Sequence, residues 1–219
     1  MDPEEHYRAL CTKVDAFFER VQERHGDQMQ CKSGCFDCCQ AGLTVTLVEA
    51  ASIARYLLGG VEGPEGPFDT RAAHAAQGNR GDSAAHAAQG NRGGATQGNR
   101  IGAARGNRGG CVALDEGGRC TIYAVRPLVC RSHGVPIRHR EPGRSLPVLD
   151  ACYRNFTDGA LAAVPAEDQL DQNTLSTTLA AIDAAFADAA GTPRGTRLEL
   201  EELLADPAGL FDVDVEDQP

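Results

Sequence analysis

The stretch Cys31-Lys32-Ser33-Gly34-Cys35-Phe36-Asp37-Cys38-Cys39 places four cysteines in a short segment without helical or strand periodicity. A second block follows further along the chain, at Cys111, Cys120, Cys130 and Cys152. Short spacings of this kind let one turn of backbone direct two or three thiolates to a common point, as a tetrahedral zinc ion or an iron–sulfur cluster requires. The two blocks therefore predict a metal centre.

The neighbouring residues Cys38 and Cys39 limit how that centre is built. Their side chains diverge from one short piece of backbone, so a single ion is poorly placed to bind both. Three arrangements stay open: two metal ions, a bridged cluster, or one ligand beside a thiol that only supports it. Gly34 precedes Cys35 and lets the backbone approach the bound group closely, because glycine has no side chain.

The second block carries charged residues beside its cysteines, in the run Cys120-Thr-Ile-Tyr-Ala-Val-Arg126-Pro127-Leu-Val-Cys130-Arg131-Ser-His133. Pro127 restricts the residue before it to extended backbone and so fixes the approach to Cys130. Arg126 and Arg131 flank that thiolate, and their guanidinium groups are predicted to offset the negative charge of the centre through hydrogen bonds to the ligands. His133 is predicted either as a further ligand or as an ordinary surface or hydrogen-bonded histidine.

The composition sets limits on the rest of the chain. Leu, Val, Phe and Ile make up about 20% of the residues, Trp is absent and the net charge is −10, so metal is expected to supplement a thin core. No apolar run approaches the roughly 20 residues of a membrane span, and the acidic N-terminus lacks the apolar region of a secretory signal. We therefore expect no membrane partner and a cytoplasmic location. The acidic excess disfavours nucleic acid as a partner.

Residues 59–110 differ in composition from everything around them. They repeat a Gln/Arg-Gly-Asn-Arg unit at 77–80, 89–92, 97–100 and 105–108, which predicts a disordered, low-complexity insertion. Residues 1–58 and 111–204 are predicted to form one domain around it, and 205–219 an acidic tail. The expected fold is mostly α-helical, with a small irregular cysteine-rich core centred on metal and a few short strands.

Two long helices are predicted from their end signals. Asp2 caps a helix that Gly26 stops, and Cys11 lies at the edge of its apolar stripe as a small buried residue rather than a ligand. Pro165 opens an Ala-rich helix that Gly191 closes. Both helices are expected to bury one apolar face.

Two capping boxes are predicted as well. A short strand over 43–45 leads into the first box, in which Thr46 and Glu49 open a helix that ends near 59–60. The second box pairs Thr196 with Glu199 at the start of a short acidic helix.

Taken together, these motifs resemble a known family. The pattern Cys-x3-Cys-x2-Cys-Cys, a helix containing Glu49, and then Cys-x8-Cys-x-Ile-Tyr-x-x-Arg-Pro-x-x-Cys-Arg is similar to the YkgJ-type cysteine-cluster proteins, described as zinc- or iron-chelating domains. The resemblance covers 31–58 and 111–152. It implies zinc or iron as the cofactor, with these ligands: Cys31, Cys35, Cys38, Cys39, Cys111, Cys120, Cys130 and Cys152.

The sequence favours a metal-binding protein over an enzyme, with a metal that stabilises the fold and is carried or sensed. An iron–sulfur enzyme or electron carrier is the alternative, because the first three cysteines match the motif of radical S-adenosylmethionine enzymes and some relatives carry the domain in protein lysine methylation machinery. Asp37 in place of an aromatic residue, and the crowding by Cys39, count against it. A thiol redox switch at Cys38 and Cys39, with lowered thiol pKa values, is the third reading.

Overall fold

The computed structural model describes residues 2–31, 35–59, 110–141, 143–144 and 146–209. Most of the predicted insertion, 60–109, and the end of the predicted tail, 210–219, lie outside these residues. The chain before and after the repeat belongs to one compact unit. About half of the described part is helical and the strands are few and short, in line with the predicted helical fold, and none of its helices is long and apolar enough to cross a membrane.

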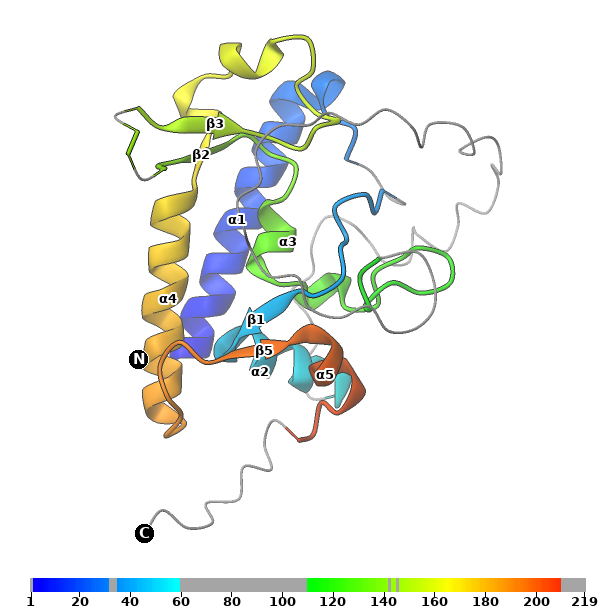
Figure 1. Cartoon of the computed structure of the whole chain (residues 1–219), viewed down its shortest axis with the longest axis vertical. Coiled ribbons are helices and arrows are strands. Elements are labelled where there is room, and N and C mark those ends of the chain that lie inside the picture. Colours follow the sequence, from blue (N-terminus) through cyan, green and yellow to red (C-terminus); the bar gives the residue numbers. More distant parts are fainter. Residues whose placement is uncertain (1, 32–34, 60–109, 142, 145, 210–219) are drawn as a thin grey trace. The chain divides into compact units, whose positions relative to one another are not determined.

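The long helices α1 (Pro3–His25) and α4 (Gln172–Ala189) pack along each other, and α2 (Leu47–Leu57) contacts both (Figure 1). The start of α1 is confirmed, since the Asp2 side chain accepts a hydrogen bond from the backbone N–H of Glu4 at 3.0 Å. The helix ends at His25, and Gly26 keeps a right-handed φ of −60° as it opens the short turn η1 (Gly26–Gln28). Cys11 is 2% exposed, which confirms it as a buried residue.

The start of α2 is held by two buried carboxylates. The predicted capping box is present, and the backbone N–H and hydroxyl of Thr46 each donate to Oε2 of Glu49 at 3.0 Å. The second carboxylate comes from α4, where Asp183 accepts the backbone N–H of Val48 at 3.0 Å. The predicted strand before the helix is β1 (Thr44–Thr46).

Two small sheets flank the helices. β1 pairs antiparallel with β5 (Arg197–Glu199), beside α2 and α5 (Leu200–Ala205). In the second sheet, β2 (Ile137–His139) lies between β3 (Val148–Asp150), which is antiparallel to it, and β4 (Leu170–Asp171), which is parallel. Short helices fill the connections: η3 (Tyr123–Val125), α3 (Leu128–Ser132), η4 (Ala160–Ala163) and η5 (Ala166–Asp168).

Two of the predicted helix starts are wrong. Pro165 precedes only the single turn of η5, and α4 begins later with Asp171 as its cap, whose side chain accepts from the backbone N–H of Thr174 at 3.0 Å. The residues of the second predicted capping box are extended instead, because 197–199 form β5 against β1. The helix that follows has no side-chain cap; its first backbone N–H, that of Leu200, donates to the carbonyl of Leu43 at 2.9 Å.

The apolar core of the described residues is divided into three small clusters. One lies between α2, α5 and the β1–β5 pair, one between α1, α2 and α4, and one at the C-terminal end of α1. Cys111 and Cys120 pack against the first cluster, whose buried residues include Val45, Ile53, Ile122 and Leu200. The second cysteine block is therefore attached to apolar packing.

Candidate metal centre

Backbone pairing brings the two cysteine blocks together. Gln40 and Gly110 form an antiparallel bridge, and the backbone N–H of Cys111 donates to the carbonyl of Cys39 at 3.1 Å. The last cysteine of the first block and the first of the second are thus neighbours in space.

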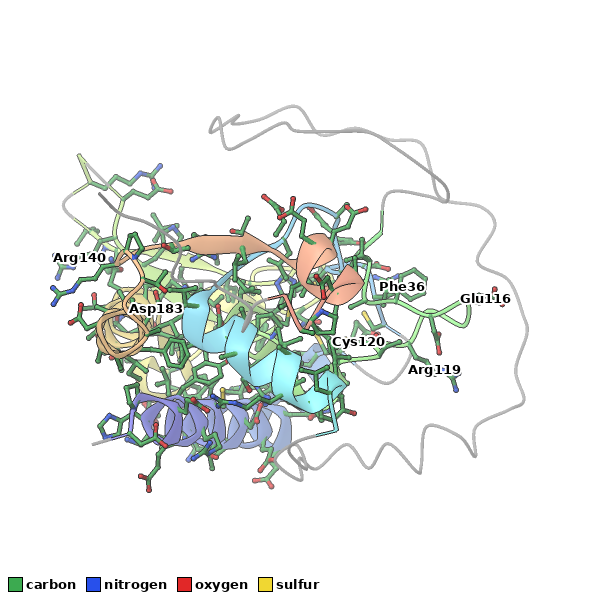
Figure 2. All side chains as sticks on the ribbon, turned by 90° about the horizontal axis from the view of Figure 1, so that it is seen from below. Phe36, Glu116, Arg119, Cys120, Arg140 and Asp183 are labelled. Carbon is green, nitrogen blue, oxygen red and sulfur yellow. The ribbon has the colours of Figure 1, made fainter. Side chains whose placement is uncertain are left out.

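A tight turn then returns the chain from Cys111 to Cys120. The backbone N–H of Thr121 donates to the carbonyl of Ala113 at 2.8 Å, and the Asp115 carboxylate accepts two backbone N–H groups within the turn at 2.9 Å each. Figure 2 shows this turn reaching away from the helices, with Glu116 and Arg119 at its tip and Cys120 at its base.

Cys130 lies on the short helix α3, which buried groups hold in place. Oε1 of Glu49, 3% exposed, accepts the backbone N–H of Leu128 at 2.9 Å, so a side chain of α2 caps α3. Burial, and then the charges of Cys120 and the cysteines around it, raises the pKa of the Cys130 thiol to about 12. Cys130 therefore lies within electrostatic range of the cysteines on the turn.

The charges of Cys111, Cys120 and Cys130 all act on Cys39, and we call these four thiols the hairpin set; the charge of Cys38 also acts on Cys130. A hydrogen bond from the neighbouring Cys38 lowers the pKa of Cys39, while burial and the charges of the other three members act in the opposite direction. Burial raises the pKa of Cys120, and the charge of Cys111 adds to that effect.

The remaining four thiols form a second group, the knuckle set: Cys31, Cys35, Cys38 and Cys152. Burial raises the pKa of Cys31; a hydrogen bond from Asn155 opposes that shift, and the charges of the other three thiols add to it. The amide Nδ2 of Asn155 lies 3.2 Å from Cys31 Sγ and 2.7 Å from the carbonyl of Gly134, and its Oδ1 accepts the backbone N–H of Gln30 at 2.8 Å. This buried amide fixes Cys31 in place.

Gly134 gives the Cys31 thiol the space it occupies. Its φ is +104°, and a Cβ atom built on it would lie 2.6 Å from Cys31 Sγ. A side chain at residue 134 would therefore displace this thiol, which is the kind of close approach that only glycine permits.

Polar side chains hold the rest of the knuckle set. Asp37 accepts a hydrogen bond from the Tyr153 hydroxyl at 2.6 Å and pairs with Nε of Arg154 at 3.0 Å, and the Arg154 guanidinium also hydrogen-bonds Cys35. His133 hydrogen-bonds the thiol of Cys38, and this bond raises the pKa of the imidazole. The hydrogen bond that Cys38 donates to Cys39 raises the pKa of Cys38 to about 12, against the opposing effect of His133. The structure thus places His133 beside a predicted ligand.

The two predicted arginines bind a carboxylate on α1. Arg126 and Arg131 pair with the two oxygens of Asp15 at 3.2 and 2.5 Å, and Arg131, 3% exposed, also donates to the carbonyls of Arg126 and Ala124. Arg126 stacks on the Tyr123 ring, 4.1 Å from its centroid. The hydrogen bonds of Arg131 thus join the turn before Cys130 to α1, and the charge of Arg126 acts on Cys120 and Cys130 from this position.

The donor chemistry of both groups fits a soft or borderline metal, because thiolate is the ligand of tetrahedral zinc and of iron–sulfur clusters. All nine cysteines are free thiols, and only Cys11 lies outside the two sets. The thiols are within electrostatic range of one another. Within the described ranges, however, no three Cys, His, Asp or Glu side chains converge closely enough to hold one ion.

Two residues that organise the centre were missed from the sequence. Asn155 holds Cys31, and Asp15 holds the Arg126–Arg131 pair, yet neither has a spacing that marks it. The only signal in the sequence that could have indicated Asn155 is its position three residues after the predicted ligand Cys152.

The comparison with known proteins agrees with the donor set. Residues 30–141 match the family model CxxCxxCC, described as "Putative zinc- or iron-chelating domain". No curated protein and no solved structure matches the chain.

Proposed function

Because the chain belongs to the CxxCxxCC family of zinc- or iron-chelating domains, we propose that its eight clustered cysteines bind two metal ions, one in the hairpin set and one in the knuckle set. The observation that carries this proposal is the different surroundings of two adjacent residues, whose thiols hydrogen-bond each other in the metal-free chain. Cys38 hydrogen-bonds His133 beside the knuckle, whereas Cys39 is paired by its backbone with Cys111 of the hairpin. Each group then contains four thiols, the number that a tetrahedral zinc site takes.

The electrostatics of the metal-free thiols support a cation in each group. Every thiolate that forms in a set disfavours the next one, as the effect of neighbouring cysteines on the pKa of Cys31 and Cys130 shows. A bound cation removes that penalty, because metal binding and thiol deprotonation are coupled. When bound, the metal supplies the positive charge that lets four thiolates coexist.

We propose that this metal stabilises the fold. The described core consists of three separate clusters, and the two sets join segments that belong to different parts of it: the 111–121 turn, which packs on the first cluster, α3, which packs on the second, and the cysteine knuckle and the 152–155 segment. A structural zinc site contributes on the order of 10 kcal/mol to folding, which is enough to decide whether a domain of this size folds.

The thiol redox switch at Cys38 and Cys39 has support on one side only. The hydrogen bond between the two thiols lowers the pKa of Cys39 but raises that of Cys38 to about 12, and a thiol that stays protonated at neutral pH is a poor nucleophile. Since the reduced thiol is also the form that binds metal, the proposal includes a reducing compartment such as the cytoplasm.

The test is to purify the full chain anaerobically and measure zinc, iron and acid-labile sulfide per chain. We expect two metal ions per chain and eight thiols protected from alkylation. Zinc without sulfide supports two mononuclear sites, and iron with sulfide supports the iron–sulfur alternative. A chain that binds neither metal after reconstitution would overturn the proposal.

Matched cysteine variants separate ligands from the ninth thiol. Cys35→Ser and Cys120→Ser are each expected to lose metal, one from each set. Cys11→Ala is the control, since Cys11 is buried in the α1–α2–α4 cluster and should keep both ions. Full metal content in either Ser variant would contradict the ligand assignment.

A further inference from the structure

The two cysteine sets are anchored by different kinds of contact. In the hairpin set, Cys111 and Cys120 pack against the α2–α5 apolar cluster, and backbone hydrogen bonds fix the turn that carries them. The third support is α3, whose first N–H binds the buried carboxylate of Glu49. Opening this set requires apolar surface to be exposed and buried hydrogen bonds to be broken, and both cost free energy.

The knuckle set is held mainly by polar contacts at the surface. Tyr153 is 75% exposed, and the side chains of Arg154 and Asp37 are 45% and 30% exposed. Among the contacts of the described residues, the Asn155 amide, which holds Cys31, is the buried anchor of this set. Exposed hydrogen bonds and ion pairs contribute little because water competes for them, so this segment is the part that opens at low cost.

Exposure of a ligand does not by itself separate the two sets. Cys38 in the knuckle set and Cys130 in the hairpin set are both exposed. The difference lies in what each cysteine is attached to. Cys130 belongs to a helix fixed by Glu49 and by the Asp15–Arg131 pair, whereas Cys38 is in the turn held by Asp37.

From this contrast, and resting on the proposed function, we infer that the hairpin ion is structural and that the knuckle ion is exchangeable. The knuckle ion is the one available to a competing thiolate or chelating ligand. This gives the protein one permanent ion and one ion that can be delivered or sensed.

The test measures zinc release from the full chain, loaded with two ions, after mixing with excess pyridylazoresorcinol in a stopped-flow instrument. We expect two phases of one ion each. In Cys152→Ser, which lacks one knuckle ligand, the fast phase should disappear, while the slow phase and the helical circular dichroism remain. Release of both ions in one phase, or a fast phase that survives in this variant, would overturn the inference while leaving the two-ion function intact. A wild-type chain that cannot be loaded with two ions would instead refute the two-site function.

A surface variant keeps the test decisive if Cys152→Ser does not fold. Arg154→Ala removes the ion pair with Asp37 and the hydrogen bond to Cys35, and it should accelerate only the fast phase, by about tenfold for the loss of charge-assisted contacts. Arg144→Ala is the matched control, because Arg144 makes a similar 3.0 Å pair with Glu141 away from the cysteines. Acceleration of the slow phase, or no change in either phase, would count against the inference.

Discussion

Glu49→Gln tests a buried carboxylate that joins α2 to α3. Glu49 is 3% exposed and accepts three hydrogen bonds, two from Thr46 at 3.0 Å and one from the backbone N–H of Leu128 at 2.9 Å. Gln keeps the shape of the side chain but has a single acceptor oxygen. That oxygen can accept from Thr46 or from Leu128, but not from both. The amide N–H of Gln then points at the backbone N–H that has lost its acceptor.

The magnitude follows from these contacts. A buried donor left without an acceptor costs about 1–3 kcal/mol, and the bond that remains loses the strength that the negative charge gave it. We therefore expect the free energy of unfolding to fall by about 2–4 kcal/mol. With a urea m-value of about 2 kcal/mol per molar, the midpoint should move down by about 1–2 M.

The assay is urea unfolding of the zinc-loaded chain, followed by circular dichroism at a fixed zinc excess, because a ligand that binds the folded state adds to stability by mass action. Glu201→Gln makes the same chemical change at an exposed position of α5 and should shift the unfolding free energy by less than about 0.5 kcal/mol. If Glu49→Gln shifts the midpoint no more than this control, the carboxylate does not join α2 to α3 as described.

Three further substitutions test other parts of the centre and its support. Gly134→Ala should cost more than Gly191→Ala, because both glycines have positive φ but only the Cβ at 134 would lie 2.6 Å from Cys31 Sγ; thermal unfolding and metal analysis should show the loss of one ion, and equal effects of the two changes would contradict this. Asp15→Asn leaves a buried guanidinium without its carboxylate and should lower the free energy of unfolding in urea by about 3 kcal/mol, whereas an unchanged midpoint would contradict the pairing. Asp171→Asn keeps the cap of α4 but removes a charge, and the loss should stay under about 1 kcal/mol because the side chain is 40% exposed. Hydrogen bonding to the first turn of the helix holds the pKa of this carboxyl below its ordinary 3.8, so its contribution is fully present above that value and is lost as the pH falls through the lower folded pKa. The difference in melting temperature should therefore be constant from about pH 8 to about pH 5.5, and a difference that vanishes within this range would contradict the assignment.

The sequence predicts a helix start correctly where side chains at that start bind the free backbone N–H groups of the first turn. Asp2 and the Thr46–Glu49 box act within a few residues of themselves, and both occur as predicted. The box predicted at Thr196 failed for a physical reason that the local sequence does not contain. Residues 197–199 find partners in β1, far away in the chain, and strand pairing satisfies the backbone groups that a helix start would otherwise leave free.

The sequence marks eight cysteines as candidate ligands but leaves their grouping open between two ions, a bridged cluster, and a ligand with a supporting thiol. The Gln40–Gly110 bridge brings the backbone of Cys39 to Cys111, a contact between the two blocks that no spacing indicates. The polar residues around the thiols, Asn155 and Asp15, are recognisable only once the folded chain brings them to Cys31 and to the Arg126–Arg131 pair.

The grouping proposed here interlocks the two blocks. The knuckle set takes three cysteines from the first block and Cys152 from the second, and the hairpin set takes Cys39 from the first block and three from the second. Neither block can then complete a site alone, so each bound ion joins the chain on both sides of the repeat. The entropy of closing a loop grows only with the logarithm of its length, and two metal-bound crosslinks outweigh that cost for a segment of this size. Under the proposed grouping, a long insertion between the blocks is therefore compatible with a small core.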